Sequence, residues 1–347
     1  QAATALDSAR RPLIIAGGGA IEAKDEIRAL AEKLGAAVFT TVAGKGLLPL
    51  NHELNAGPQL CLPQGWDYVS RADVVLAVGT ELADTDMWRD KLPINGELIR
   101  VDIDSRKMND LYPANIAIVA DVTETVSALL PLIPERKESE LDDQKSQIKT
   151  LNQDIICALE PLQQAHQQVL KVIRETLPAD AIISTDMTQL AYTGNYLFPS
   201  EQPRTWLHPT GYGTLGYGLP AGIGAKIAKP DQAVAVIVGD GGLLYTLQEL
   251  ATATEELSSP LVVLLWNNEA LGQIRDDMVS LDIPPIGVSP RNPDFIKLAE
   301  GFGCLTSRPA SLSQLGEAIE DALQKTRVTF IEIADTIVNS TTANTTG

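Results

Sequence analysis

The sequence predicts an α/β protein built from two doubly wound, mainly parallel open sheets. Short apolar runs alternate with stretches of helical periodicity, and this pattern stops at one polar segment and then restarts. Strands that are separated by helices imply parallel βαβ units with right-handed crossovers. The length of 347 residues is enough for two domains, each with its own core.

The first domain is predicted over residues 1–132. Its first strand, Pro12–Ala16, ends at the glycines Gly17 to Gly19 and leads into a helix whose apolar positions continue to Leu34. Further strands are expected at residues 36–41, 74–78, 98–103 and 116–119.

A linker is predicted at residues 133–160, and the second domain at residues 161–347. Residues 134–149 are polar, mixed in charge and poor in core-forming side chains, which indicates a solvated linker or the start of a surface helix. In the second domain we expect a glycine-rich turn at 211–218, helices at 166–177, 220–228, 247–256 and 312–323, and strands at 181–185, 233–238, 261–266 and 329–333.

Composition excludes several classes of protein. Lys and Arg number 27 against 45 Asp and Glu, a net charge of −18, which disfavours nucleic-acid and anionic-membrane partners. No apolar run approaches 18 residues, and the three widely spaced cysteines predict neither a disulfide framework nor a zinc site, so a cytoplasmic location is expected. Because the chain starts at Gln1, just before a strand, we expect a further segment upstream.

Polar residues follow two strands of the second domain at the edge where an open α/β sheet binds ligands. Asp240 lies among glycines after the strand at 233–238, and Asn268 follows the strand at 261–266. One carboxylate, one amide oxygen and a backbone carbonyl suit Mg²⁺, and glycine N–H groups suit an anion. Either motif alone is also explained by an ordinary turn, but together they predict a metal-diphosphate site.

These residues carry a family resemblance. Gly239-Asp240-Gly241 followed by Asn267-Asn268 resembles the signature of thiamine-diphosphate enzymes, and the rest resembles the acetohydroxyacid (acetolactate) synthase and 2-oxoacid decarboxylase group. The likeness covers nearly the whole chain. It implies that residues 1–132 are a Rossmann-like central domain and that the remainder binds thiamine diphosphate.

The resemblance implies individual roles. Asp240, Asn268 and the carbonyl of Ala270 would bind the metal; the carbonyl of Gly213 would accept from the cofactor's 4′-amino group, and Leu215 would hold the cofactor bent. The implied cofactor-binding residues are Gly213, Thr214, Leu215, Gly239, Asp240, Gly241, Gly242 and Asn268.

His208 precedes the cofactor loop and is a candidate for proton transfer, the alternative being a hydrogen-bonded structural histidine. With Gly213 and Leu215 it completes the predicted catalytic set. His166 is expected on a surface helix.

The segment after the metal site bears on the substrate. Where synthases have Gly-Met-Val-x-Gln-Trp, this chain has Gly272, Gln273, Ile274 and Arg275, then Asp276 and Asp277. Two carboxylates near a substrate pocket would attract a cationic tail, and the segment is similar to guanidino-oxopentanoate decarboxylases. Alternatively, the two aspartates lie on a solvated helix face. Gln273, Asp276 and Asp277 are the predicted substrate contacts.

The resemblance implies a thiamine-diphosphate-dependent lyase or transferase acting on a small 2-oxoacid, in a homodimer or homotetramer with shared sites. The resemblance implies that the family's activating Glu lies in a further, N-terminal domain that is not part of residues 1–347, so these residues alone are expected to be inactive. FAD, which synthases hold, is disfavoured because residues 79–84 lack a basic and aromatic pattern, and Gly17 to Gly19 are equally explained by a tight turn. Three alternatives are an acetolactate synthase large subunit proper, a catalytically silent cofactor-binding fragment and, because GxGxxG is absent, more weakly a nicotinamide-dependent oxidoreductase.

Overall fold

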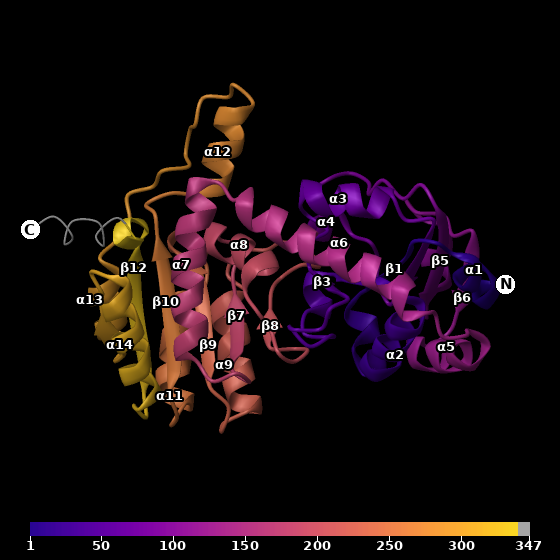
Figure 1. Ribbon diagram of the computed structural model, residues 1–347. Coiled ribbons are helices and arrows are strands. Elements are labelled where there is room, and N and C mark those ends of the chain that lie inside the picture. The colour runs from indigo at the N-terminus through magenta and orange to yellow at the C-terminus, as the bar shows by residue number, and fades with distance from the viewer. Residues whose placement is uncertain (339–347) are drawn as a thin grey trace, which may run out of the picture. The chain divides into compact units, whose positions relative to one another are not determined.

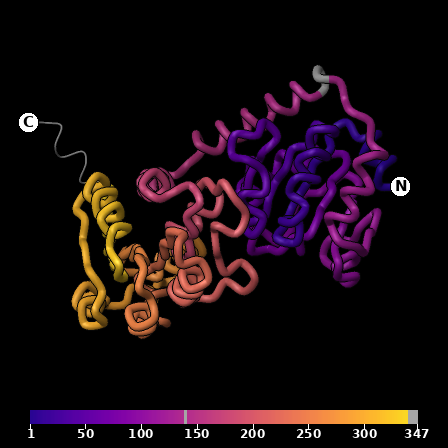
Figure 2. The backbone as a smooth tube through the Cα atoms, turned by 90° about the horizontal axis from the view of Figure 1, so that it is seen from below, coloured from indigo at the N-terminus to yellow at the C-terminus, as the bar shows by residue number. Residues whose placement is uncertain are grey.

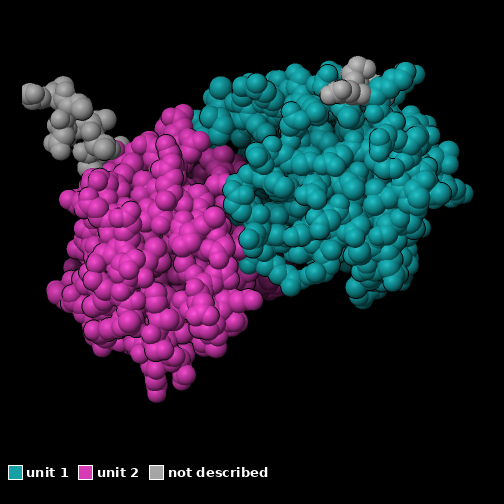
Figure 3. Space-filling model, turned by 60° about the horizontal axis from the view of Figure 1, so that its bottom comes forward, with its two compact units in different colours: residues 1–159, 200–204 teal, residues 160–199, 205–347 magenta. Residues whose placement is uncertain are grey.

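The computed structural model describes residues 1–338, except for the side chains of residues 138–140, and divides into two compact units (Figure 3). Unit 1 consists of Gln1–Leu159 with Ser200–Arg204, and unit 2 of Glu160–Pro199 with the chain from Thr205 onward. Each unit contains a six-stranded sheet whose neighbouring strands are all parallel. The predicted fold class of two doubly wound parallel sheets is confirmed.

The sheet of unit 1 has the strand order β3-β2-β1-β4-β5-β6. Its central strands are apolar and buried on both sides, as expected for a sheet that helices cover on both faces. The strands are β1 (Pro12–Ala16), β2 (Ala37–Thr40), β3 (Asn55–Gly57), β4 (Val74–Val78), β5 (Glu97–Asp102) and β6 (Ile116–Val119). The helices are α1 (Ala2–Ser8), α2 (Lys24–Leu34), α3 (Pro63–Ser70), α4 (Asp84–Met87), α5 (Val122–Leu129) and α6 (Glu138–Cys157).

Of the two alternatives for residues 134–149, the structure has the start of a helix. α6 runs along unit 1 (Figure 2). It packs there through Ile148, Leu151 and Ile155, which share the apolar core of the unit, while Gln144 accepts a hydrogen bond from the hydroxyl of Tyr68. The apolar residues are three to four positions apart, so the helix buries one narrow stripe beneath a polar surface.

The sheet of unit 2 has the order β11-β12-β10-β9-β7-β8. Its strands are β7 (Ile182–Thr185), β8 (Trp206–Leu207), β9 (Val234–Gly239), β10 (Leu261–Asn267), β11 (Leu305–Ser307) and β12 (Val328–Ala334). Its helices are α7 (Pro161–Thr176), α8 (Gln189–Leu197), α9 (Gly218–Ala228), α10 (Asp240–Leu243), α11 (Glu249–Glu256), α12 (Gly272–Ser280), α13 (Phe295–Gly301) and α14 (Leu312–Leu323).

Alternate side chains of β9 and β10 point to opposite faces, and each face has its own helices. Helices α9, α11 and α13 share one core with one set of strand residues, and α7 and α14 pack on the opposite side. The carboxyl ends of β7, β9 and β10 therefore meet at one edge, beyond which α12 projects (Figure 1). No helix within residues 1–338 is both long and apolar enough to cross a membrane.

Candidate functional site

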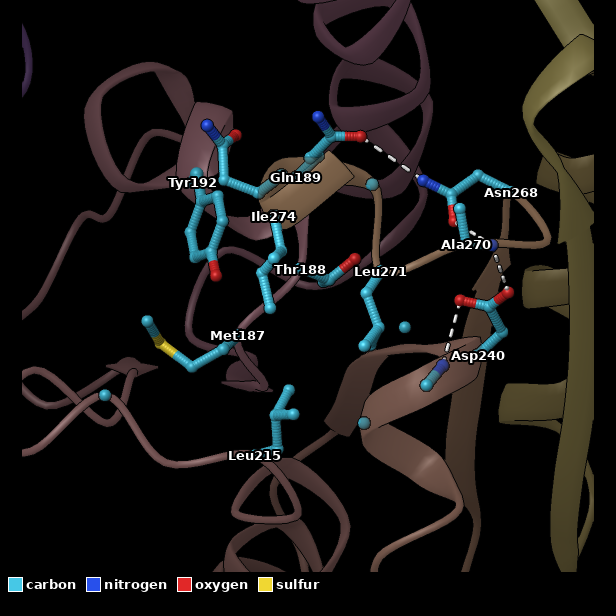
Figure 4. Close-up of a pocket in the computed structure, with 16 residues that line it drawn as sticks. Met187, Thr188, Gln189, Tyr192, Leu215, Asp240, Asn268, Ala270, Leu271 and Ile274 are labelled. Atoms are coloured by element: carbon cyan, nitrogen blue, oxygen red, sulfur yellow. Dashed lines mark hydrogen bonds between the residues drawn. The ribbon is translucent and has the colours of Figure 1, made fainter. Parts of the chain in front are cut away.

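A cavity of about 190 Å³ opens at the carboxyl ends of β7, β9 and β10 in unit 2 (Figure 4). Its lining comes from four separate segments of the chain, which the parallel sheet brings to one edge. The lining residues are Met187, Thr188, Gln189, Tyr192, Gly213, Leu215, Gly239, Asp240, Gly241, Gly242, Asn268, Ala270, Leu271, Gly272, Gln273 and Ile274.

Most of the predicted site residues lie in this lining, and four do not. Gly213, Leu215, the run from Gly239 to Gly242, Asn268, Ala270 and Gln273 all face the cavity. The four outside the lining are His208, Thr214, Asp276 and Asp277.

The predicted metal ligands converge on one backbone amide. The Asp240 carboxylate accepts from the N–H of Ala270 at 3.2 Å, and the Asn268 side-chain oxygen accepts from the same N–H at 3.3 Å. Asp240 is only 2% exposed, and burial raises its pKa above the usual range. A buried carboxylate and an amide oxygen that share a donor can also share a cation, which would stabilise the ionised carboxylate.

The glycines beside Asp240 are closely approached by neighbouring side chains. A Cβ on Gly241 would lie 2.5 Å from Leu271 Cδ2, and a Cβ on Gly242 would lie 2.9 Å from Asp186 Oδ1. Neither position accepts a side chain without movement of its neighbours. Close packing against Leu271 and Asp186 therefore requires glycine at these two positions, which also line the cavity.

The donor set fits a hard cation. It contains one carboxylate and neutral oxygens, which is the chemistry of Mg²⁺ bound together with phosphate oxygens. Across the described part of the chain, no group of three or more His, Cys, Asp and Glu side chains is arranged to hold a metal. The site therefore suits a magnesium ion that is held jointly by the protein and a diphosphate, rather than one held by protein ligands alone.

The loop that carries Gly213 and Leu215 is anchored by Asp186, which the sequence analysis missed. The Asp186 carboxylate accepts from the backbone N–H groups of Gly216 at 3.1 Å and Gly218 at 2.9 Å. Gly213 has a positive φ of 69°, which favours glycine at this turn. Asp186 directly follows β7, and this strand-end position was the available signal.

His208 lies behind the cavity wall rather than in it. Its Nδ1 is 2.7 Å from the hydroxyl oxygen of Thr185. Its ring packs edge to face on the ring of Tyr192, with the ring centroids 6.3 Å apart. Tyr192 lines the cavity, so the histidine contacts the lining through this tyrosine.

The aspartates of α12 border the cavity without lining it. Asp276 accepts from Gln189 Nε2 at 2.8 Å and from Arg275 Nε at 3.1 Å, and Asp277 accepts from Gln273 Nε2 at 2.9 Å. The two glutamines whose side-chain amides donate these hydrogen bonds, Gln189 and Gln273, line the cavity. The two carboxylates are thus one side chain away from the cavity.

Gln189 is the second residue that the sequence analysis missed. Its Oε1 accepts from the Asn268 side chain at 3.2 Å while its Nε2 donates to Asp276. It therefore connects a predicted metal ligand with a predicted substrate residue. Its position at the start of α8, after β7, was the only signal in the sequence.

The glycine turn of unit 1 is used for internal packing. The N–H groups of Gly17 and Gly19 donate to the carbonyls of Val78 and Gly79, both at 3.0 Å, and a Cβ on Gly17 would lie 2.3 Å from Gly79 O. These two amides are therefore not offered to a dinucleotide phosphate. The turn does not fit FAD in that role.

Two parts of the chain match described families. Residues 1–129 match the thiamine pyrophosphate enzyme central domain, and residues 186–333 match the thiamine pyrophosphate enzyme C-terminal TPP binding domain. The second match contains the whole cavity lining.

Curated relatives extend over nearly the whole chain. It is 57% identical over 332 residues to a probable 2-ketoarginine decarboxylase, AruI, of Pseudomonas aeruginosa, covering 96% of this chain and 59% of that protein. It is 31% identical over 315 residues to the acetolactate synthase isozyme 1 large subunit of Escherichia coli, covering 88% and 55%. A probable acetolactate synthase large subunit of Methanocaldococcus jannaschii is 32% identical over 359 residues, with 96% and 59% covered. The chain thus spans less than two thirds of the length of these relatives.

Proposed function

The chain belongs to the thiamine pyrophosphate enzymes, and on this premise we propose that it forms the metal- and diphosphate-binding side of a 2-oxoacid decarboxylase active site. The proposed substrate is a 2-oxoacid with a cationic, guanidinium-like tail. The observation that carries this proposal is the pair Asp276 and Asp277 beside the cavity, in a chain 57% identical to a probable 2-ketoarginine decarboxylase.

For the cofactor, we propose that Asp240, Asn268 and the carbonyl of Ala270 hold Mg²⁺. The backbone N–H of Gly242, which lines the cavity, would receive the diphosphate, because the N–H of Gly241 donates to Asp240 itself. When bound, thiamine diphosphate supplies the electron sink that decarboxylation of a 2-oxoacid requires. Gly213 would accept a hydrogen bond from the cofactor's amino group, and Leu215, which faces the cavity, would press the cofactor into its bent form.

For the substrate tail, the two aspartates differ in what already balances their charge. Asp276 is paired with Arg275, whereas Asp277 accepts from the neutral amide of Gln273. A guanidinium group would therefore gain more from Asp277, because an unbalanced carboxylate forms the stronger charge-assisted hydrogen bond. For His208, the hydrogen bond to Thr185 and the position outside the cavity lining support the alternative of a structural histidine over proton transfer.

A second candidate, acetolactate synthase, is supported by relatives at 31–32% identity. We favour the decarboxylase because aspartates occupy the positions of the Gln and Trp of the synthase pattern. We also propose an oligomer that shares its sites between subunits. A cytoplasmic location accords with three cysteines that are all free thiols.

The test is an assay of CO₂ release by the native protein with Mg²⁺ and thiamine diphosphate. We expect 5-guanidino-2-oxopentanoate to be decarboxylated with a higher kcat/KM than pyruvate. Acetolactate formation from pyruvate as the faster reaction would instead identify a synthase. No turnover of either oxoacid would reject both.

A further inference from the structure

Asn292 lies against the proposed metal site but is not among the residues that line the cavity. Its Nδ2 donates to Asp240 Oδ2 at 2.6 Å and to Asn267 Oδ1 at 3.0 Å. Asn292 is 52 residues from Asp240 in the sequence and lies between α12 and α13. A single amide thus joins the ends of the two strands that carry the predicted metal ligands.

The orientation of this amide follows from its partners. Both acceptors, a carboxylate oxygen and an amide oxygen, lack a hydrogen to donate, so the Asn292 nitrogen must face them. Its Oδ1 is then turned away from them. This oxygen is buried and has no hydrogen-bond partner within residues 1–338.

The contacts continue from Asn267 across the sheet. Asn267 Nδ2 donates to Glu332 Oε1 on β12 at 2.8 Å, and Arg308 donates to Glu332 Oε2 at 2.6 and 3.0 Å. Glu332 is 7% exposed, whereas the Arg308 side chain is 58% exposed. The network therefore ties the ends of β9, β10 and β12 together and reaches the surface.

The segment that carries Asn292 is itself held in place. Asp294, two residues later, is the N-cap of α13 and accepts from the backbone N–H of Lys297 at 3.3 Å. The helix start thus limits how far the amide can move.

These contacts match what a cation-binding carboxylate needs. Asp240 accepts from the backbone N–H groups of Gly241 and Ala270 as well as from Asn292, so three donors fix its plane. Mg²⁺ keeps several of its waters in proteins, and a water on the ion is a hydrogen donor. A buried acceptor beside the metal carboxylate is a suitable partner for such a water.

We propose that Asn292 is a positioning residue of the metal site, which orients Asp240 through Nδ2 and accepts from a water of the bound ion through Oδ1. This inference rests on the metal site of the proposed function. Residues that orient metal ligands typically change metal affinity by about 10- to 100-fold when removed.

The test is the affinity of the native protein for Mn²⁺, which replaces Mg²⁺ as a paramagnetic probe, measured by electron paramagnetic resonance with thiamine diphosphate present. Asn292→Ala should weaken Mn²⁺ binding by about 10- to 100-fold. The matched control is Asn95→Ala in unit 1, where an exposed asparagine donates to the carbonyl of Ser70; its Mn²⁺ affinity should equal that of the unchanged protein. Circular dichroism melts establish that each variant is folded.

The outcomes separate the two proposals. If Asp240→Ala abolishes Mn²⁺ binding and Asn292→Ala leaves it unchanged, the role of Asn292 is wrong and the metal site stands. If Asp240→Ala also has no effect, the metal site itself is wrong. Should Asn292→Ala fail to fold, Asn292→Ser takes its place, because serine is too short to reach both acceptors and should lose affinity in the same direction.

Discussion

At the scale of single residues, Asp186 and Asp240 show how two similar positions acquire different tasks. Each carboxyl follows a strand of unit 2, each is buried, and burial raises the pKa of each. Both carboxylate oxygens of Asp186 accept hydrogen bonds from backbone N–H groups, those of Met187, Gly216 and Gly218. Asp240 lines the cavity, so only Asp240 is placed to bind an ion.

Asp240→Ala should abolish thiamine diphosphate binding in the presence of Mg²⁺, because the site offers no other carboxylate in its lining. Isothermal calorimetry on the native protein measures this, and EDTA should have the same effect as the substitution. Asp104→Ala, at a partly exposed carboxylate of unit 1 outside the cavity lining, is the control and should bind normally. Undiminished affinity in Asp240→Ala would refute the metal assignment.

Asp277→Asn should lower kcat/KM for 5-guanidino-2-oxopentanoate by roughly 10- to 150-fold, the equivalent of one charge-assisted hydrogen bond of about 1.5–3 kcal/mol. Pyruvate, which has no cationic tail, should be little affected. Asp276→Asn is the matched comparison and should cost less, since Arg275 already balances that charge. Equal losses on both oxoacids would mean that Asp277 supports the fold instead.

At the scale of elements, α7 shows that a polar residue can belong to the buried face of a helix. His166 was expected on a surface helix, but it is 1% exposed, with Nδ1 at 2.9 Å from the hydroxyl of Thr193 and its ring edge-on to Trp266. The expectation was wrong although the periodicity agrees with the structure. His166, Val169, Leu170 and Ile173 recur at i, i+3, i+4 and i+7 and form the buried face of α7, which packs against α8 and α14. Burial lowers the pKa of His166 to about 4.

Because of His166, the free energy of unfolding should decrease as the pH falls from about 6.5 to about 4. In that range the unfolded chain binds a proton at His166 and the folded protein does not, so acid favours unfolding, by up to roughly 3 kcal/mol. Urea unfolding of the unchanged protein and of His166→Gln over this range gives a difference curve. It should be flat above about pH 6.5 and slope below it; a flat curve throughout would contradict the buried neutral histidine.

The loop of residues 213–218 is the element that Asp186 holds. Asp186→Ala should leave the amides of Gly216 and Gly218 without their acceptor and reduce the free energy of unfolding by roughly 1.5–3 kcal/mol per lost bond to a charged group. Hydrogen exchange at those two amides should accelerate. Exchange as slow as in the unchanged protein would show that other contacts hold the loop.

At the scale of the whole molecule, the two units share one architecture and differ in what occupies the sheet edge. In unit 1 the glycine turn packs against the neighbouring loop, whereas in unit 2 the corresponding edge opens into the cavity. The parallel sheet thus provides the location in both units, and the loops decide whether a ligand can enter.

Adding Mg²⁺ and thiamine diphosphate to the native protein should slow hydrogen exchange in residues 186–189, 213–218, 239–242 and 268–274, because a ligand that binds only the folded state suppresses local opening. Residues 17–19 and 79–84 of unit 1 should be unchanged, also when FAD is added. Protection of the unit 1 segments by FAD would show that the central domain holds this cofactor after all.

The sequence by itself determined the two parallel sheets and the pair Asp240 and Asn268. Apolar runs mark the strands, and strands that alternate with helices are typical of parallel sheets, in which the carboxyl ends of the strands share one edge. It did not reveal β3, β8 or β11, since strands of two or three residues are too short to show a period.

Only the tertiary structure decided which other residues lie beside the predicted site. Asn292 and Gln189 gain their importance from partners 52 and 79 residues away, and His208 is separated from the cavity by Tyr192. Sequence patterns report contacts between neighbours along one helix or strand, because those recur at fixed spacing. A hydrogen bond between distant loops has no such spacing; it exists only once the packing of the whole unit has placed both partners.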